Sequence, residues 1–537
     1  MEENDAPRLR LPTRLLGLPP DHDLHRPCPG GDHRGRTPFL GRLSEPATRT
    51  PFHDRQRPRR RALPRLGPRP AAASIRRTPR GPRPVNNSPS LTASTAIKPA
   101  DGTSEPGLVL RIHPADEPAM QAHAGAASLE LDTPIAEKAA FNVGSVAKQI
   151  TAYLCVRAAR DGLLQLDRAV DSVLPRFRVP GVTVAELIQH HGGVRDAESL
   201  LSLAGFRDLD HYTADDLLQL AYRQRDRAVE PGRFLYSNTG YLLVAEVLRH
   251  VHGASLQEIA KQQVFAPLGM SSARFKSDPR EVIPGAASSY RRTATGWVHQ
   301  QRPVTLPGPG SLWCTATDLD RWLGHLWHEW QTTPESTLPF GQHLSYRPSD
   351  HAPFTYGAGL YADGRPGRTA VFHYGHEQGF SAAARLTSTG LRIVCLSNHS
   401  GVAADHVTAT AMADLTRHPR TAPSQLLSRV LRAQSTPKIT AADDRKAEQD
   451  APHTPVGTYA CGEVPGTVRL TSSGGSLYLW RRGTRDRLAR TSSTTYTADG
   501  YTLALPIKPR GDSGALIDSF ILNLDRAPGL HYERCPD

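Results

Sequence analysis

The chain has 537 residues and a formal net charge of +13, so it is long enough for more than one domain. Most of the positive excess lies in the first 100 residues, which hold 20 Lys and Arg, 8 Asp and Glu and 18 of the 46 prolines. The remaining chain is nearly neutral, which argues against a folded domain built around a basic surface. The six cysteines are scattered without a Cys-x-x-Cys pair, which argues against a zinc ribbon or a dense disulfide scaffold.

Residues 1–104 are predicted to be a disordered basic segment, because they lack a sustained apolar period and are rich in proline and arginine. The run Arg55–Arg61 could contact nucleic acid or an anionic lipid surface, and a nucleic-acid-associated protein is therefore one possibility. A solvated tail, or sequence upstream of the true start codon, is the simpler interpretation. We therefore expect no nucleic acid partner.

No secretory signal is visible near the N-terminus, because the run Leu9–Leu18 is interrupted by arginine and proline. No apolar run approaches the ~18 residues that a membrane span needs. These features predict a cytoplasmic protein without a membrane span, unless the start site is misassigned.

The segment 105–420 is predicted to form an α/β (α+β) domain, an antiparallel sheet covered by helices with its terminal strands adjacent. Strands are expected at the start and towards the end of this segment, at 108–112, 126–131, 369–373, 380–386 and 391–396. Helices are expected between and after them, at 145–160, 182–188, within 194–232, and at 241–251, 255–265, 317–327 and 403–415. Gly253 is expected to cap the helix 241–251 in the left-handed conformation.

Residues 421–452 are polar and are predicted to be a linker, and residues 453–537 alternate short strands with turns. This pattern predicts a small β barrel or sandwich. Cys461 and Cys535 lie on its first and last predicted strands. If these strands are neighbours in a barrel, the two thiols could come within bridging distance.

Ser145 and Lys148 are the candidate nucleophile and base. Ser145 opens a predicted helix, so Lys148 lies one turn further along the same face. A lysine shielded from water can lose its proton and then accept the proton of the serine hydroxyl. The helix start also offers free backbone N–H groups where an oxyanion would form. A second Ser-x-x-Lys, Ser435–Lys438, contains a proline and lies in the predicted linker, so it cannot present the same helical face.

Two further motifs follow in the chain. Tyr236 and Asn238 form its one Tyr-x-Asn, in which the phenol can relay protons and the amide can hold the lysine and a substrate amide. His373-Tyr374-Gly375 is the His-x-Gly that lies between predicted strands. An edge strand there could offer a backbone N–H to an oxyanion.

These motifs, in this order, resemble the serine β-lactamase-related family, which includes class C β-lactamases, DD-peptidases, D-aminopeptidases and related esterases. Framework phrases of roughly residues 106–418 carry the same resemblance: 161–167, 187–193, 236–241, 267–270 and 373–375. The residues after 453 resemble the small lipocalin-like domain of some members. The resemblance implies an active site between the sheet and an all-helical part.

The resemblance also implies the roles of individual residues. Ser145 would be the nucleophile, Lys148 and Tyr236 the base system, and Asn238, His373, Gly375 and His376 the substrate-binding residues. The backbone N–H groups of Ser145 and His376 would form the oxyanion hole. No cofactor and no metal are implied.

His373 stands where classical β-lactamases of this family carry a lysine, so a permanent cation for a substrate carboxylate is missing. We therefore expect a serine hydrolase that acts through an acyl-enzyme on an ester, an amide or a D-amino-acid peptide, more as an esterase or peptidase than as an efficient β-lactamase. If His373 titrates near 6.5, recognition of a carboxylate would depend on pH. The alternative is a penicillin-recognising protein that acylates slowly or not at all.

Other serine hydrolase classes find little support in the sequence. Gly511–Gly514 resembles the nucleophile loop of chymotrypsin-like proteases but reads as a hairpin turn without a double barrel around it. The chain has no Gly-x-Ser-x-Gly, which removes the α/β-hydrolase interpretation.

Overall fold

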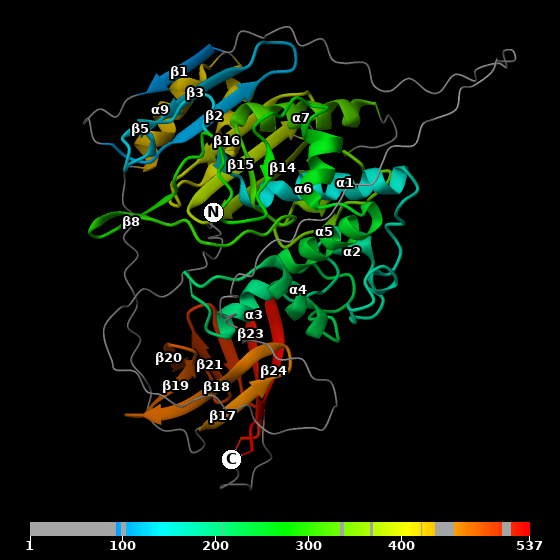
Figure 1. The fold of residues 1–537 in the computed structure, drawn as a ribbon. Helices are drawn as coiled ribbons and strands as arrows, with labels where there is room; N and C mark the ends of the chain where they lie inside the picture. The colour runs from blue at the N-terminus through cyan, green and yellow to red at the C-terminus, as the bar shows by residue number, and fades with distance from the viewer. Residues whose placement is uncertain are drawn as a thin grey trace, which may run out of the picture. The chain divides into compact units, whose positions relative to one another are not determined.

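The computed structural model describes residues 104–207, 209–332, 338–365, 369–419, 421–434, 456–506 and 517–536, and the backbone of 93–97. All of these residues belong to one compact unit. It comprises a large sheet with its covering helices, a helical part and a barrel (Figure 1). Residues 93–97 form a strand of the large sheet, so the prediction of disorder is wrong for them. The rest of the predicted disordered segment up to residue 103, the Ser435–Lys438 motif and the Gly511–Gly514 turn lie outside the described residues.

The large sheet has nine strands in the order β1-β3-β2-β16-β15-β14-β13-β12-β11. Its strands are β1 (Ala93–Ile97), β2 (Leu108–His113), β3 (Met120–Ala124), β11 (Arg347–Pro348), β12 (Thr355–Gly357), β13 (Leu360–Asp363), β14 (Ala370–Glu377), β15 (Phe380–Thr387) and β16 (Arg392–Ser397). All neighbouring pairs are antiparallel except β1 and β3. The pairing of β2 with β16 confirms the predicted contact between the terminal strands, and the α/β class is confirmed with it.

Helices cover both faces of the sheet, and for this reason all six residues of β16 are buried. Its odd-numbered positions, Ile393 and Cys395, pack in a cluster with α8 (Ala404–Arg417) and α9 (Pro423–Gln434). Its even-numbered positions, Val394 and Leu396, face the larger core that includes α7 (Ala316–Gln331). This alternation is the two-residue period of a strand buried on both sides.

Helix α9 occupies part of the segment that we predicted to be a linker, so the linker prediction is wrong for residues 423–434. The reason is an apolar pair, Leu426 and Leu427, which is buried against β2 and β3. Two leucines in an otherwise polar stretch gave too weak a period to predict a packed helix.

The helical part lies beside the sheet and contains α1 to α6 (Figure 1). A short 3₁₀ turn, η1 (Gly144–Ala147), leads into α1 (Lys148–Arg160). The remaining helices are α2 (Val184–Ile188), α3 (Ala197–Leu203), α4 (Ala214–Arg223), α5 (Asn238–His252) and α6 (Leu256–Ala260), which continues as the π turn η3 (Lys261–Phe265). Gly253 ends α5 with φ 64°, which confirms the predicted cap.

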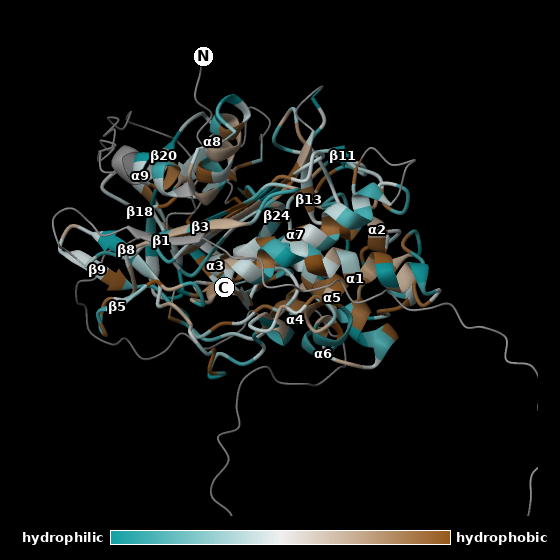
Figure 2. Ribbon diagram, turned by 90° about the horizontal axis from the view of Figure 1, so that it is seen from above, coloured by the Kyte–Doolittle hydropathy of each residue, from teal (hydrophilic) through white to brown (hydrophobic). Residues whose placement is uncertain are grey.

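Hydrophobic and hydrophilic residues are interspersed along α1, α2 and α6 in Figure 2. The hydrophobic faces of these helices join one continuous core, and α1 packs on α5. Short strands connect this part to the sheet: β4 (Ala126–Ser128), β5 (Thr133–Pro134), β6 (Phe141–Asn142), β7 (Arg274–Phe275), β8 (Tyr290–Thr293), β9 (Gly296–His299) and β10 (Leu312–Cys314).

The C-terminal residues form a closed eight-stranded barrel, which confirms the predicted small all-β unit. Its strands are β17 (Gly457–Cys461), β18 (Val464–Ser473), β19 (Ser476–Arg481), β20 (Thr484–Arg490), β21 (Thr495–Ala498), β22 (Tyr501–Ala504), β23 (Ser519–Leu524) and β24 (Ala527–Arg534). β17 pairs with β24 and closes the barrel. The prediction missed β20 and β21. In β20, Leu488 is the one buried residue of a mostly polar segment, so the strand has no apolar alternation.

Cys461 and Cys535 do not pair with each other, although their strands are neighbours. Cys461 is a free buried thiol, whereas Cys535 is disulfide-bonded. The register explains why, because the Cys535 amide bonds to the carbonyl of Thr458, three positions before Cys461. Three strand residues span ~10 Å, which is beyond the reach of a disulfide.

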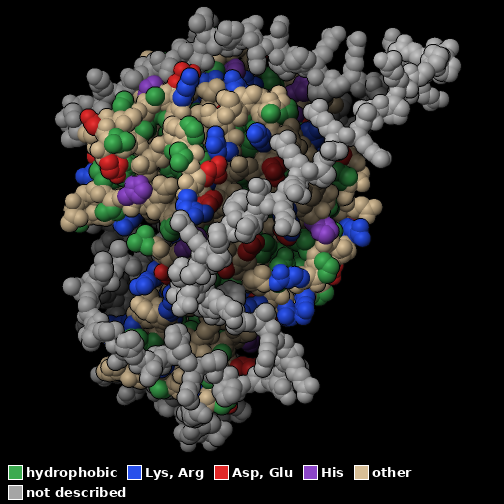
Figure 3. Space-filling model, viewed as in Figure 1, with side chains coloured by type: hydrophobic (Ala, Val, Ile, Leu, Met, Phe, Trp, Pro, Cys, Tyr) green, Lys and Arg blue, Asp and Glu red, His purple; other side chains and the backbone are tan. Residues whose placement is uncertain are grey.

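Charges of both signs are interspersed on the face of the molecule in Figure 3, in keeping with the near neutrality of the chain after its first 100 residues. Among the described helices, none has the length and apolar character needed to cross a membrane.

Candidate active site

Ser145 lies in η1, immediately after a sharp turn of the chain. Gly144 adopts φ 50°, and its amide donates to the side-chain oxygen of Asn142 at 3.0 Å. The turn leaves Ser145 partly exposed and buries Lys148 completely at the start of α1. Lys148 Nζ lies 2.9 Å from Ser145 Oγ, so the predicted serine–lysine pair is in direct contact.

Lys148 has two other polar neighbours, and both are acceptors. Its Nζ lies 2.9 Å from Asn238 Oδ1 and 2.8 Å from the carbonyl oxygen of Pro309. A neutral amine has two N–H donors and one lone pair. In the neutral form of Lys148, the two carbonyl oxygens engage both donors, and the lone pair is left to accept the proton of Ser145. Burial favours this form because it lowers the pKa of Lys148, while Tyr236 acts in the opposite direction.

Tyr236 and Asn238 lie at the start of α5, as their motif requires. Ser237 caps the helix by accepting from the Gly240 amide at 3.3 Å. The Tyr236 ring centroid is 5.0 Å from Lys148 Nζ. The Asn238 amide group donates from Nδ2 to Glu198 at 3.0 Å, so its oxygen is directed at the lysine. Asn238 therefore orients Lys148, and both ends of its amide are engaged within the protein.

Strand β14 passes very close to η1, and Gly375 permits the approach. A Cβ atom on Gly375 would lie 2.2 Å from the Val143 carbonyl oxygen and 2.6 Å from the Ser145 nitrogen. A Cβ atom on Gly144 would lie 3.1 Å from the His376 nitrogen. The backbone N–H groups of Ser145 and His376 thus lie near each other beside the serine hydroxyl. Only glycine fits at position 375, because a side chain would collide with the backbone of η1.

His373 is not the titrating residue that the sequence suggested. Its side chain is buried, with Nε2 3.1 Å from the Tyr356 hydroxyl and Nδ1 2.6 Å from the Tyr374 carbonyl oxygen. Burial, helped by the charge of Lys148, lowers the pKa of His373 to about 3. The expectation of a titration near 6.5 is therefore wrong, because the sequence could not show that the ring is enclosed by aromatic side chains.

Two acidic residues that the motifs did not indicate support Asn238. Glu198 accepts from Asn238 and, at 2.8 Å, from the Tyr212 hydroxyl. Burial raises the pKa of Glu198, and the nearby charge of Asp196 adds to this effect. Asp196 caps α3 and also accepts from the Asn238 backbone amide at 2.8 Å. Their only signal in the sequence was the spacing Asp-x-Glu after Gly193.

His190 packs its ring against the ring of Tyr236. Its ring centroid lies 4.2 Å from that of Tyr236. Its carbonyl oxygen accepts from the Leu235 amide at 2.7 Å, and its Nδ1 accepts from the Ser237 amide at 3.2 Å. His190 thus holds the backbone on both sides of Tyr236.

No group of three or more potential metal ligands exists within the part of the chain that the structure describes.

The sequence matches the Beta-lactamase family over residues 93–417, which is more than half of the chain. It is 24% identical over 295 residues to a D-aminopeptidase of Cereibacter sphaeroides, covering 54% of this chain and 55% of that protein. It is 27% identical over 193 residues to penicillin-binding protein 4* of Bacillus subtilis, covering 35% of this chain and 41% of that protein. The chain thus spans about half the length, or less, of these curated relatives.

A solved structure shows the same fold. The octameric penicillin-binding protein homologue from Pyrococcus abyssi aligns with a TM-score of 0.51 at 21% identity, over 80% of this chain and 95% of that one. Together, the fold, the serine–lysine pair and the family match define the class. The chain belongs to the Beta-lactamase family, a family of serine hydrolases.

Proposed function

We propose that the protein hydrolyses ester or amide bonds through an acyl-enzyme on Ser145. The observation that supports this most directly is the 2.9 Å contact between Ser145 and a buried Lys148 whose pKa is lowered. Lys148 accepts the Ser145 proton as Oγ attacks the carbonyl carbon. The N–H groups of Ser145 and His376 stabilise the oxyanion that forms. Tyr236 passes a proton to the leaving group, and water then releases the acyl group.

The substrate class that we favour is a short peptide or amide containing a D-amino acid. Relatives named D-aminopeptidase support this choice. The buried, neutral His373 argues against efficient β-lactam hydrolysis, because it offers no cation to the carboxylate that penicillins carry. Esterase activity is expected as a second readout of the same acyl-enzyme.

Steady-state hydrolysis of p-nitrophenyl acetate, a D-amino acid amide and a penicillin tests the proposal. We expect turnover of the ester and the amide, and much slower turnover of the penicillin. A stoichiometric burst without turnover on all three would instead support the second candidate, a slowly acylating penicillin-recognising protein. Relatives named penicillin-binding proteins keep that candidate open.

A further inference from the structure

The turn between β23 and β24 brings a barrel residue to the catalytic tyrosine. It consists of Asp525 and Arg526. The Arg526 carbonyl oxygen accepts from the Asp196 amide at 2.9 Å. Its guanidinium carbon lies 4.8 Å from the centroid of the Tyr236 ring. The hairpin therefore places a cation next to Tyr236, the residue that would donate a proton to the leaving group.

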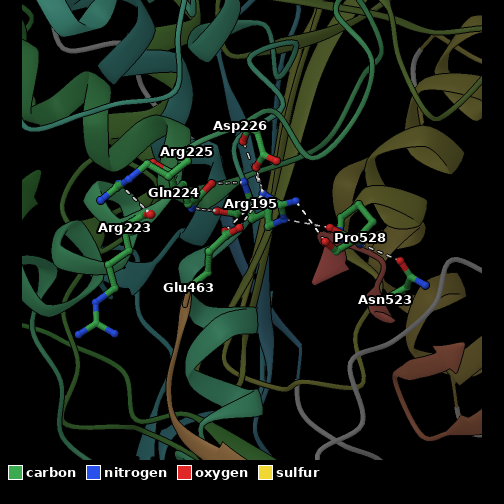
Figure 4. Close-up of polar contacts among 9 residues, drawn as sticks. Arg195, Arg223, Gln224, Arg225, Asp226, Glu463, Asn523 and Pro528 are labelled. Carbon is green, nitrogen blue, oxygen red and sulfur yellow. Dashed lines mark hydrogen bonds and ion pairs between the residues drawn. The ribbon is translucent and has the colours of Figure 1, made fainter. Parts of the chain in front are cut away.

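A buried arginine of the catalytic domain holds this hairpin. Arg195 donates from Nε to the Pro528 carbonyl oxygen at 2.9 Å, and it pairs with Asp226 at 3.1 Å and Glu463 at 3.2 Å. Figure 4 shows the side chain reaching between these three partners. The Arg195 backbone is fixed in turn by reciprocal bonds with the Gln224 side chain, at 2.9 and 3.0 Å. These contacts of Arg195 fix the position of the hairpin against the catalytic domain.

The guanidinium of Arg526 has no such pairing. Within the described residues, no carboxylate forms an ion pair with it. The oxygens of Asp196 already accept from the amides of Ser199 and Asn238, and those of Glu198 accept from Tyr212 and Asn238. Although burial acts against it, the charges of Asp196 and Tyr236 raise the pKa of Arg526. A half-buried, charged guanidinium therefore lies against the Tyr236 ring, and no hydrogen bond engages its N–H donors within the described residues.

We propose that Arg526 binds a carboxylate on the leaving-group side of the substrate. This inference rests on the proposed function, because the side is assigned from the role of Tyr236 as proton donor to the leaving group. In a peptide, Ser145 Oγ forms a bond to the carbonyl carbon, the C–N bond breaks, and the amine leaves with the proton. A leaving residue with a free α-carboxylate would present both oxygens to the guanidinium. The barrel thus selects peptides cleaved at their C-terminal residue.

The test compares two substrates that differ only in this charge. They are acetyl-D-phenylalanyl-D-phenylalanine and the same peptide with a C-terminal amide. In the wild-type protein kcat/KM should favour the free carboxylate. In Arg526→Gln the ratio of kcat/KM, carboxylate over amide, should fall about 10- to 100-fold, mainly through KM. Arg526→Lys should keep an intermediate ratio, because it retains the charge without the fork.

Arg487→Gln is the matched control, since it removes the same charge from an exposed position on β20. It should leave the ratio unchanged. Arg195→Met should lower the ratio as Arg526→Gln does, and the double variant should show little further loss, because both changes act on one hairpin. Equal activity of the wild type on both peptides, or an unchanged ratio in Arg526→Gln, would overturn the proposal.

Failure of the proposed function has a different signature. If the wild type turns over neither peptide nor the p-nitrophenyl ester, the acyl-enzyme proposal fails, and the subsite is then judged by binding. Calorimetry on Ser145→Ala should show that D-phenylalanine binds more tightly than D-phenylalaninamide, and Arg526→Gln should remove the difference. Equal binding of the two ligands would contradict the carboxylate subsite.

Discussion

Lys148 is the residue on which the proposed chemistry depends most, because burial favours its neutral form and two carbonyl acceptors fix its position. Its pKa is lowered in the folded protein. The unfolded chain therefore binds this proton more tightly between the lowered value and the ordinary value of about 10.4. Stability contributed by this site thus falls as pH decreases through that window. The same protonation removes the base.

We predict that kcat/KM for a neutral ester rises with pH along a limb that belongs to Lys148 and lies below its ordinary range. Lys148→Arg should lower the acylation rate by about 10²- to 10⁴-fold, because arginine stays protonated. Stopped-flow acylation across pH measures both effects. An Arg variant with the wild-type rate and pH profile would show that another group is the base.

His373 is a second residue whose pKa is lowered by burial, and we expect it to affect stability. Its folded pKa of about 3 lies below the ordinary 6.5, so the neutral ring contributes stability above 6.5 that is lost as pH falls from 6.5 towards 3. We predict that His373→Lys costs about 2–4 kcal/mol in the free energy of unfolding, since it places a cation in a buried, aromatic environment. Urea unfolding at pH 8 measures this.

His373→Gln is the control, because it keeps a neutral hydrogen-bonding side chain. It should unfold at a clearly higher urea concentration than the lysine variant. Equal stability of the two variants would mean that position 373 tolerates charge and is open to solvent.

At the level of elements, the site depends on how closely β14 lies against η1. We predict that Gly375→Ala lowers kcat/KM about 10²-fold or more, because its Cβ would lie 2.2 Å from the Val143 carbonyl oxygen and force the strand away. Gly364→Ala is the control, since a Cβ there meets nothing within 4 Å. Measuring kcat/KM for ester hydrolysis by the two variants tests this prediction. Similar rates would show that the strand can move without harm to the site.

Helix α9 extends the catalytic domain beyond the predicted boundary at residue 420. Leu427 is fully buried there, whereas Gln425 is exposed. We predict that Leu427→Ala lowers the free energy of unfolding by about 2–4 kcal/mol and that Gln425→Ala changes it by less than about 0.5 kcal/mol. Chemical denaturation of both variants provides the comparison. A Leu427→Ala protein as stable as Gln425→Ala would show that α9 does not pack.

The sequence predicted elements where a strong local signal existed. The serine helix, the Tyr-x-Asn segment, the cap at Gly253 and the three final strands of the domain each carry such a signal. Strands β11 to β13 were missed because they are short, and β3 because it follows its partner β2 after a few polar residues. Gly375 could be located by its motif, but the near contact with Val143 could not.

At the scale of the whole molecule, the barrel reaches the candidate site through Arg526, which contacts Tyr236 and Asp196. Arg526 lies far from Tyr236 in the sequence, and no motif links the two. Their meeting depends on the docking of Arg195 against the hairpin, which is a tertiary contact without a local pattern. For the same reason the sequence led us to seek the substrate cation at His373. Our proposal instead assigns this cation to Arg526 of the barrel.

The central claim is that Ser145 becomes acylated with Lys148 as its base. The most direct measurement is intact-protein mass spectrometry after incubation with a fluorophosphonate and, separately, with a penicillin. We predict that the fluorophosphonate adds one probe per chain, that peptide mapping places it on Ser145, and that Ser145→Ala remains folded by circular dichroism but unlabelled. Labelling of Ser145→Ala at the wild-type rate, or a probe mapped to another residue, would contradict the account.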